Sequence, residues 1–232
     1  MTPQPARDDE ESTTQGGGAG GPADGASAGC RVRLGDPGDA PQAAAWHAEL
    51  IPQGFLSSLG ERLLRRLYGR VVRSPGSFLL MAEAGDDPAG FIAGTTSIRR
   101  LYRDFAVRDG MSAFAGSAPR LVASWPRAVE TLRHGRDRRG PERVPSAACG
   151  ELLAMAVDPA QRGRGIGRML VDGFLDQLSR RGTRCARVVV GADNIAAVSL
   201  YGRAGFRTEE TFELHRGSRS LLMTRTVSGG RS

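Results

Sequence analysis

The spacing at which hydrophobic and polar residues recur changes along the first hundred residues of this chain. They alternate over 30–34, which predicts a strand. Residues 41–50 fit one helix, and the apolar residues within 55–68 recur at helical spacing, which predicts a second, amphipathic helix. The runs 77–82 and 90–96 are apolar and enclose turn-forming residues, so we expect a hairpin of two strands.

The final third of the chain has the clearest pattern. An apolar run over 151–157 ends at Asp158-Pro159, which predicts a buried strand followed by a glycine-rich loop. The pattern then predicts a helix from Ile166, a second buried strand at 186–190, a short helix from Asn194 to Gly205, and strands near 208–215 and 219–226. This order predicts a mixed α/β sheet with a βαβ unit at its centre.

Two segments lack such patterns. Residues 1–29 are polar and rich in glycine, so they bury too little apolar surface to offset the entropy of ordering, and we expect a disordered tail. Residues 99–145 carry many arginines and only scattered apolar positions, and we expect a helical insertion there. The remainder, 30–232, is expected to form one domain.

The composition limits the classes of protein to which this chain can belong. Of its 232 residues, 40% are hydrophobic and 25% charged, as in globular proteins. No run reaches the ~18 apolar residues of a membrane span, and the N-terminus has no apolar signal-peptide core, so we expect a cytoplasmic protein without membrane contact. The cysteines are widely spaced and odd in number, which predicts neither a metal site nor a disulfide framework: Cys30, Cys149 and Cys185.

Every basic residue is arginine, and the formal net charge is +7. Residues 1–29 are acidic, so the positive charge lies on the rest of the chain. Such a charge suits nucleic acid, an acidic substrate or a phosphorylated coenzyme, but an arginine-rich solvated surface explains it as well. Because neither a helix-turn-helix signature nor interleaved basic and aromatic residues are found, we expect no nucleic-acid partner.

The glycine-rich loop has the features of an anion site. It lies between a predicted strand and a predicted helix, and its glycines at 163, 165 and 167 let the backbone turn tightly beside a ligand. The helix N-terminus adds unpaired N–H groups and partial positive charge, and Arg162 and Arg164 add mobile charge. A Walker loop is excluded because the chain has no lysine, and the dinucleotide fingerprint lacks its third small residue. A plain turn at the start of a helix is the alternative.

The motifs around this loop resemble those of the GNAT superfamily of acetyltransferases. They are Arg162-x-x-Gly165-x-Gly167, the strand end Val157-Asp158-Pro159, and Asn194-x-x-Ala197-x-x-x-Tyr201-x-x-x-Gly205-Phe206. The resemblance is strong over about 150–206. It implies a central mixed β-sheet of about six to seven strands flanked by helices, with a helical insertion between the third and fourth strands, and acetyl-CoA as cosubstrate.

The resemblance also implies which residues bind the coenzyme. The loop would hold its pyrophosphate, mainly through backbone N–H groups, at Arg162, Gly163, Arg164, Gly165, Ile166 and Gly167. In this family the fourth strand splays from the fifth, and its free backbone pairs with the pantetheine arm, which places Met155, Ala156 and Val157 along that arm. The asparagine position, Asn194, would contact the coenzyme near the pantetheine, and Tyr201 would lie near the thioester sulfur.

Acetyl transfer to an amine needs a base and an acid, because a primary amine with a pKa near 10.4 is unprotonated in only about one molecule in a thousand at neutral pH. Tyr201 is the expected acid for the leaving thiolate, unless it only packs the short helix against the sheet. Glu151, eleven residues before Arg162, is the expected base, unless it is a solvated residue at a strand end. Rival carboxylates occur near the last strands: Glu209, Glu210 and Glu213.

The expected function is therefore acetyl-CoA-dependent N-acetyl transfer to a primary amine by direct attack in a ternary complex, with a small-molecule acceptor. Two alternatives remain open, namely a protein acetyltransferase acting on N-termini or lysines, and a non-catalytic acyl-CoA-binding module. Because relatives in this family are frequently dimers, a homodimer is a further expectation.

Overall fold

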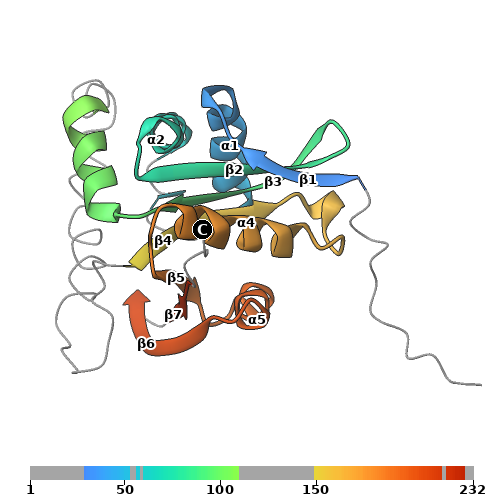
Figure 1. Ribbon diagram of the computed structural model, residues 1–232, viewed down its shortest axis with the longest axis vertical. Helices are drawn as coiled ribbons and strands as arrows, with labels where there is room; N and C mark the ends of the chain where they lie inside the picture. Colours follow the sequence, from blue (N-terminus) through green and yellow to red (C-terminus); the bar gives the residue numbers. More distant parts are fainter. Residues whose placement is uncertain (1–28, 53–55, 58–59, 110–148, 216–217, 228–232) are drawn as a thin grey trace, which may run out of the picture.

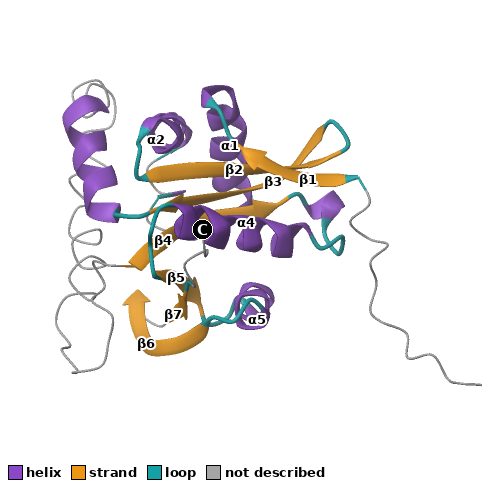
Figure 2. Cartoon of the chain, in the orientation of Figure 1, coloured by secondary structure: helices purple, strands orange, loops and turns teal. Residues whose placement is uncertain are grey.

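The computed structural model describes residues 29–52, 56–57, 60–109, 149–215 and 218–227. These residues form one seven-stranded mixed sheet in the order β1-β2-β3-β4-β5-β7-β6, with helices on both faces (Figure 2). The strands are β1 (Cys30–Leu34), β2 (Ser77–Ala84), β3 (Asp87–Thr95), β4 (Cys149–Val157), β5 (Cys185–Gly191), β6 (Arg207–His215) and β7 (Ser218–Thr226). The predicted fold class is confirmed.

The helices divide between the two faces of the sheet. Figure 1 shows α1 (Ala40–Leu50) and α2 (Glu61–Arg73) on one face and α4 (Ile166–Arg180) on the other, with α5 (Ile195–Arg203) beside the C-terminal strands. Neighbouring residues of β2 point to opposite faces, so Leu79 packs with α1 and α2 whereas Leu80 packs with α4. Burial on both faces explains why the central strands read as continuous apolar runs.

The helix boundaries differ from the prediction at one point. The apolar stripe predicted a helix beginning near Phe55, but α2 begins at Glu61. Gly60 precedes it with φ 82° and ψ 157°, a backbone conformation that no helix contains. Of the predicted insertion, residues 98–109 are helical, and 110–148 lie outside the described residues, as does most of the predicted tail. No helix in the described ranges is long and apolar enough to cross a membrane.

A disulfide corrects the expectation drawn from cysteine spacing. Cys149 and Cys185 are bonded, with Cα atoms 4.4 Å apart, while Cys30 is free. The two residues are 36 positions apart in sequence but lie directly opposite each other as the first pair of the parallel β4–β5 ladder. Spacing along the chain carries no trace of this register, which is why the sequence argument was wrong.

Candidate functional site

β4 and β5 separate soon after they pair. Their parallel ladder consists of three residue pairs, ending at Glu151 opposite Arg187. Beyond this point β4 remains paired with β3, and β5 remains paired with β7. Among the described residues, the facing edges, 152–157 of β4 and 188–191 of β5, have no strand partner. We call these edges the β4–β5 divergence.

A β-bulge accompanies the divergence. Ala93 of β3 lies opposite Ala154, whereas the next residue, Gly94, lies opposite Leu152, so Leu153 is an extra residue in β4. A bulge bends its strand and re-aims the local backbone groups, and such bulges are frequent beside active sites. The bulge lies immediately after the last pair with β5, at the point where the two strands separate.

The predicted pantetheine-binding residues lie on the unpaired edge of β4. Met155 and Val157 pack in the cluster that contains α4, and Ala156 packs in the cluster of α1 and α2. Their side chains therefore point to the two faces of the sheet. The backbone between them has a free edge on the β5 side, so an extended ligand could pair with it as an added strand.

The glycine loop follows β4 through a short 3-10 turn, Pro159–Gln161. Asp158 caps this turn by accepting a hydrogen bond from Ala160 N at 2.8 Å. Gly163 and Gly165 then adopt φ of 79° and 78°, in the left-handed region that other residues enter only with strain. A Cβ atom at either glycine would meet no atom of the described residues within 4 Å, so the surface of the loop is open in this part of the structure.

Five consecutive N–H groups, those of residues 163–167, make no hydrogen bond to the part of the chain that the structure describes. The first helical bonds of α4 are donated by Arg168 N and Met169 N to the carbonyl of Gly165, at 2.9 and 3.1 Å. The five N–H groups therefore remain available at the positive end of a fifteen-residue helix. This arrangement is suited to a phosphate group.

The side chains of the loop differ in their roles. Arg162 is exposed, whereas Arg164 is half-buried and donates a hydrogen bond to Gln161. Ile166 is 1% exposed and belongs to the core, so only its backbone can face a ligand. A Cβ atom at Gly167 would lie 3.2 Å from Leu200 of α5. Gly167 therefore also allows α4 and α5 to approach each other, a packing role that the motif does not reveal.

Asn194 lies between β5 and α5. Its side-chain oxygen accepts a hydrogen bond from Ala197 N at 3.1 Å and so caps α5, as the sequence predicted. Its backbone N–H donates to the carbonyl of Gly191, the last residue of β5. The cap uses the side-chain oxygen and leaves the amide NH₂ group as the donor that a ligand could meet.

Tyr201 is buried, yet its hydroxyl has no hydrogen-bond partner among the described residues. The residue is 4% exposed, and its ring packs against Phe206 with centroids 5.7 Å apart. No buried polar side-chain atom in the described part of the chain lacks a partner, so this hydroxyl must reach the surface. Burial raises the pKa of Tyr201, which keeps the phenol protonated at neutral pH. The ring packs, and the hydroxyl remains free to donate.

Glu151 forms an ion pair across the start of the divergence. Arg187 donates from Nε at 3.0 Å and from Nη2 at 2.7 Å, both to Oε2 of Glu151. The side chains are 15% and 17% exposed, so Glu151 is not a freely solvated residue at a strand end. Tyr102, in the helical segment 98–109, is next to this pair: burial, and then the charge of Glu151, raises the pKa of Tyr102.

Sequence reasoning missed both Arg187 and Tyr102. Arg187 interrupts an apolar strand, a signal that could have marked it, but its partner depends on the β4–β5 register. Tyr102 falls in the insertion, where the pattern was weak. The rival carboxylates Glu209, Glu210 and Glu213 lie on β6, which β7 separates from β5.

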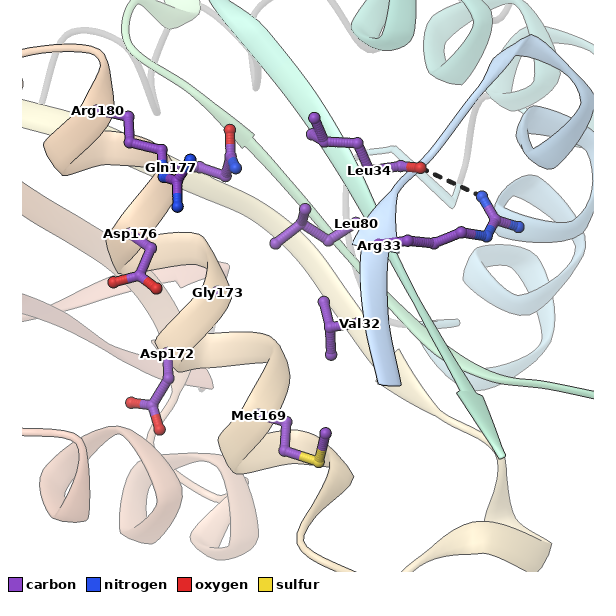
Figure 3. A pocket seen from close by; sticks show the side chains of 10 residues that line it. All are labelled: Val32, Arg33, Leu34, Leu80, Met169, Asp172, Gly173, Asp176, Gln177 and Arg180. Carbon is purple, nitrogen blue, oxygen red and sulfur yellow. Dashed lines mark hydrogen bonds between the residues drawn. The ribbon is translucent and has the colours of Figure 1, made fainter. Parts of the chain in front are cut away.

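A groove elsewhere on the molecule lies between β1 and α4 (Figure 3). It encloses about 410 Å³ and is lined on the helix side by the carboxylates of Asp172 and Asp176. Arg33 and Arg180 also line it, and the five loop residues with free N–H groups do not. No group of three or more metal-ligating side chains occurs among the described residues.

Comparison with known proteins places this geometry in context. Residues 45–206 match the acetyltransferase (GNAT) family. A mycothiol acetyltransferase of Geodermatophilus obscurus is 42% identical over 126 residues, which are 54% of this chain and 31% of that protein. Another, of Beutenbergia cavernae, is 44% identical over 64 residues, 28% of this chain and 22% of that protein. The chain thus spans less than a third of the length of either relative.

Solved structures share the fold at low identity. A GCN5-related N-acetyltransferase of Kribbella flavida superposes with a TM-score of 0.57 at 20% identity, covering 86% of this chain and 98% of that one. A putative acetyltransferase of Salmonella typhimurium, solved with its cofactor acetyl-CoA, gives 0.56 at 13% identity, covering 88% and 97%. At these identities the likeness shows the fold alone.

Proposed function

The chain belongs to the GNAT acetyltransferase family, and from this premise we propose that it transfers the acetyl group of acetyl-CoA to a primary amine of a small molecule, by direct attack in a ternary complex. One observation carries the proposal. The five unpaired N–H groups of residues 163–167 follow directly on the unpaired edge of β4. A diphosphate and an extended arm attached to it therefore have adjoining places to bind.

The residues present fit such a coenzyme. The N–H groups at the start of α4 offer donors to its diphosphate, and Arg162 adds an exposed positive charge beside them. The backbone of Met155 and Val157 offers a free strand edge to its amide-containing arm. Bound acetyl-CoA supplies a thioester, whose carbonyl carbon is open to attack by an amine.

The chain's own groups then move the protons. Glu151 takes a proton from the incoming ammonium group, because only the neutral amine is nucleophilic. The nitrogen–carbon bond forms and the carbon–sulfur bond breaks. A backbone N–H near the bulge stabilises the negative oxygen, a contribution of about 2–4 kcal/mol in comparable sites. Tyr201 gives the departing thiolate a proton. The nitrogen enters as an ammonium group and leaves as an amide, so it gives up two protons. Glu151 takes the first and passes it to solvent, and the second replaces, through solvent, the proton that Tyr201 gave, so one proton is released per turnover.

The acceptor is proposed to be a small molecule because the relatives named mycothiol acetyltransferase acetylate one. The proposed acceptor side is the face of α1 and α2, where Tyr102 lies beside Glu151. Acetylation of that particular thiol compound by this chain is not implied, since the match covers less than a third of those proteins.

A thiol-release assay tests this function. The protein is incubated with acetyl-CoA and a library of primary amines. Free thiol is followed with a chromogenic disulfide, and the masses of the products are measured by mass spectrometry. We expect thiol release that matches acetylated amine one to one, with intersecting initial-velocity lines typical of a ternary complex. Coenzyme A binding by calorimetry without turnover on any small amine contradicts the proposal and favours a binding module. Turnover on peptides alone refutes the small-molecule acceptor.

A further inference from the structure

The ion pair between Glu151 and Arg187 is asymmetric. Both donor nitrogens of Arg187, Nε and Nη2, bind the same carboxylate oxygen, Oε2, at 3.0 and 2.7 Å. The pair is in register across the last rung of the β4–β5 ladder, so the backbone of both strands fixes where the two side chains start. Glu151 is consequently held by one oxygen.

The other oxygen, Oε1, is free. It accepts no hydrogen bond from the described residues. Since the described side chains contain no buried polar atom without a partner, Oε1 reaches solvent. It does so where β4 and β5 begin to separate. The carboxylate therefore has a clamped oxygen and an accessible one, at the closed end of the divergence.

We propose that Arg187 is a positioning residue for acetyl transfer: it clamps Oε2 of Glu151 so that Oε1 faces the incoming amine. The inference rests on the proposed function, in which Glu151 is the base. A base held by a third group is the arrangement that activates many acyl-transfer sites. Misplacing a catalytic group by 1 Å can lower a rate about 100-fold, so holding the carboxylate in one rotamer can increase the rate of transfer considerably.

Three uncharged side chains lead from this pair toward α1 and α2. Tyr102 faces Glu151 from the segment 98–109, and its raised pKa keeps the phenol neutral. Tyr68 of α2 interacts with Tyr102 and hydrogen-bonds His47 of α1, whose pKa burial lowers to about 4. Among the described residues, Arg187 is the ion-pair partner of Glu151.

The test compares Arg187→Met with Arg187→Lys. We expect Arg187→Met to lower kcat/KM about 10- to 100-fold, with the loss in kcat rather than in KM, because the carboxylate loses the group that orients it. Arg187→Lys should restore only part of kcat, since an ammonium cannot form the forked contact. The affinity for coenzyme A should change less than threefold in both variants.

Arg31→Met is the matched control. Arg31 of β1 is also paired in register with a glutamate on the neighbouring strand, Glu83, at 2.6 Å, but on the far edge of the sheet. This variant should leave kcat nearly unchanged. If Arg187→Met lowered kcat no more than Arg31→Met does, Arg187 would only join two strands and the inference would be wrong.

A measurement without turnover separates this inference from the proposed function. Crystal structures of the natural protein and of Arg187→Met show whether the Glu151 side chain keeps one rotamer. We expect one rotamer in the natural protein and several in Arg187→Met, and the same single rotamer in both overturns the clamp. A lost rotamer in a protein that acetylates no amine overturns the proposed function, and the catalytic role of Arg187 with it.

Discussion

Replacing Gly165 with alanine perturbs the proposed coenzyme site at a single atom. Gly165 has φ 78° and ψ −3°, and an L-residue in this left-handed region costs about 1–2 kcal/mol. In a protein of this size each kcal/mol lowers Tm by about 2–4 °C, so Gly165→Ala should melt about 2–8 °C below the natural protein. Its new methyl group meets no atom within 4 Å in the described ranges of the chain, so packing there adds nothing to this cost.

The same methyl group should weaken coenzyme binding. It occupies space on the open surface of the loop, beside the N–H groups of residues 163–167 that the diphosphate would contact. A loss of one good phosphate contact, about 1.4 kcal/mol, corresponds to a tenfold weaker Kd. We therefore expect calorimetry to give a Kd for coenzyme A at least tenfold higher in Gly165→Ala.

Gly85→Ala separates the effect on binding from the effect on stability. Gly85 has φ 65°, its Cβ would also meet nothing within 4 Å, and it lies in the turn between β2 and β3. It should lower Tm by a similar amount and leave the Kd unchanged. If Gly165→Ala bound coenzyme A as tightly as Gly85→Ala does, the loop would not grip the diphosphate and the reasoning would be refuted.

Three further predictions concern buried groups. Tyr201→Phe should leave coenzyme A affinity nearly unchanged and lower kcat at least tenfold in steady-state kinetics; an unchanged kcat removes the acid role. His47 is buried and its pKa falls from 6.5 to about 4, so the unfolded chain binds more protons between these values. The free energy of unfolding should therefore be unaffected by His47 above pH 6.5 and fall by about 2–3 kcal/mol as the pH drops to 4. Denaturant titrations of His47→Gln at several pH values should lack this loss. If the free energy of unfolding fell equally with pH in both proteins, the prediction would be wrong. Alkylation of the unfolded, unreduced protein should label Cys30 but not Cys149 or Cys185, and reduction should lower the free energy of unfolding by up to about 3–4 kcal/mol; three labelled thiols would disprove the disulfide.

Features with local causes were predictable from the sequence. The alternation over 30–34 matches β1, and the strand before the glycine loop, the helix after it and the Asn194 cap all occur where the pattern placed them. Each depends on residues within one or two turns of chain. Gly165 illustrates this, because its left-handed φ is a property of the residue itself.

Features that depend on strand register were not predictable. The Cys149–Cys185 bond and the contact of Arg187 with Glu151 join residues 36 positions apart, and both arise from the three rungs that β4 and β5 share. The start of α2 was misjudged for a different reason. The apolar stripe continued through Gly60, whose backbone conformation ends any helix. Sequence motifs thus pointed to candidate site residues, whereas the residues that contact them could be identified only from the fold.

A crystal structure of the protein with coenzyme A tests the central claim most directly. The account predicts oxygen atoms of the diphosphate at 2.7–3.2 Å from backbone nitrogens of residues 163–167, with the attached arm along the free edge of β4. A diphosphate bound elsewhere on the chain, with these nitrogens facing only water, would contradict it.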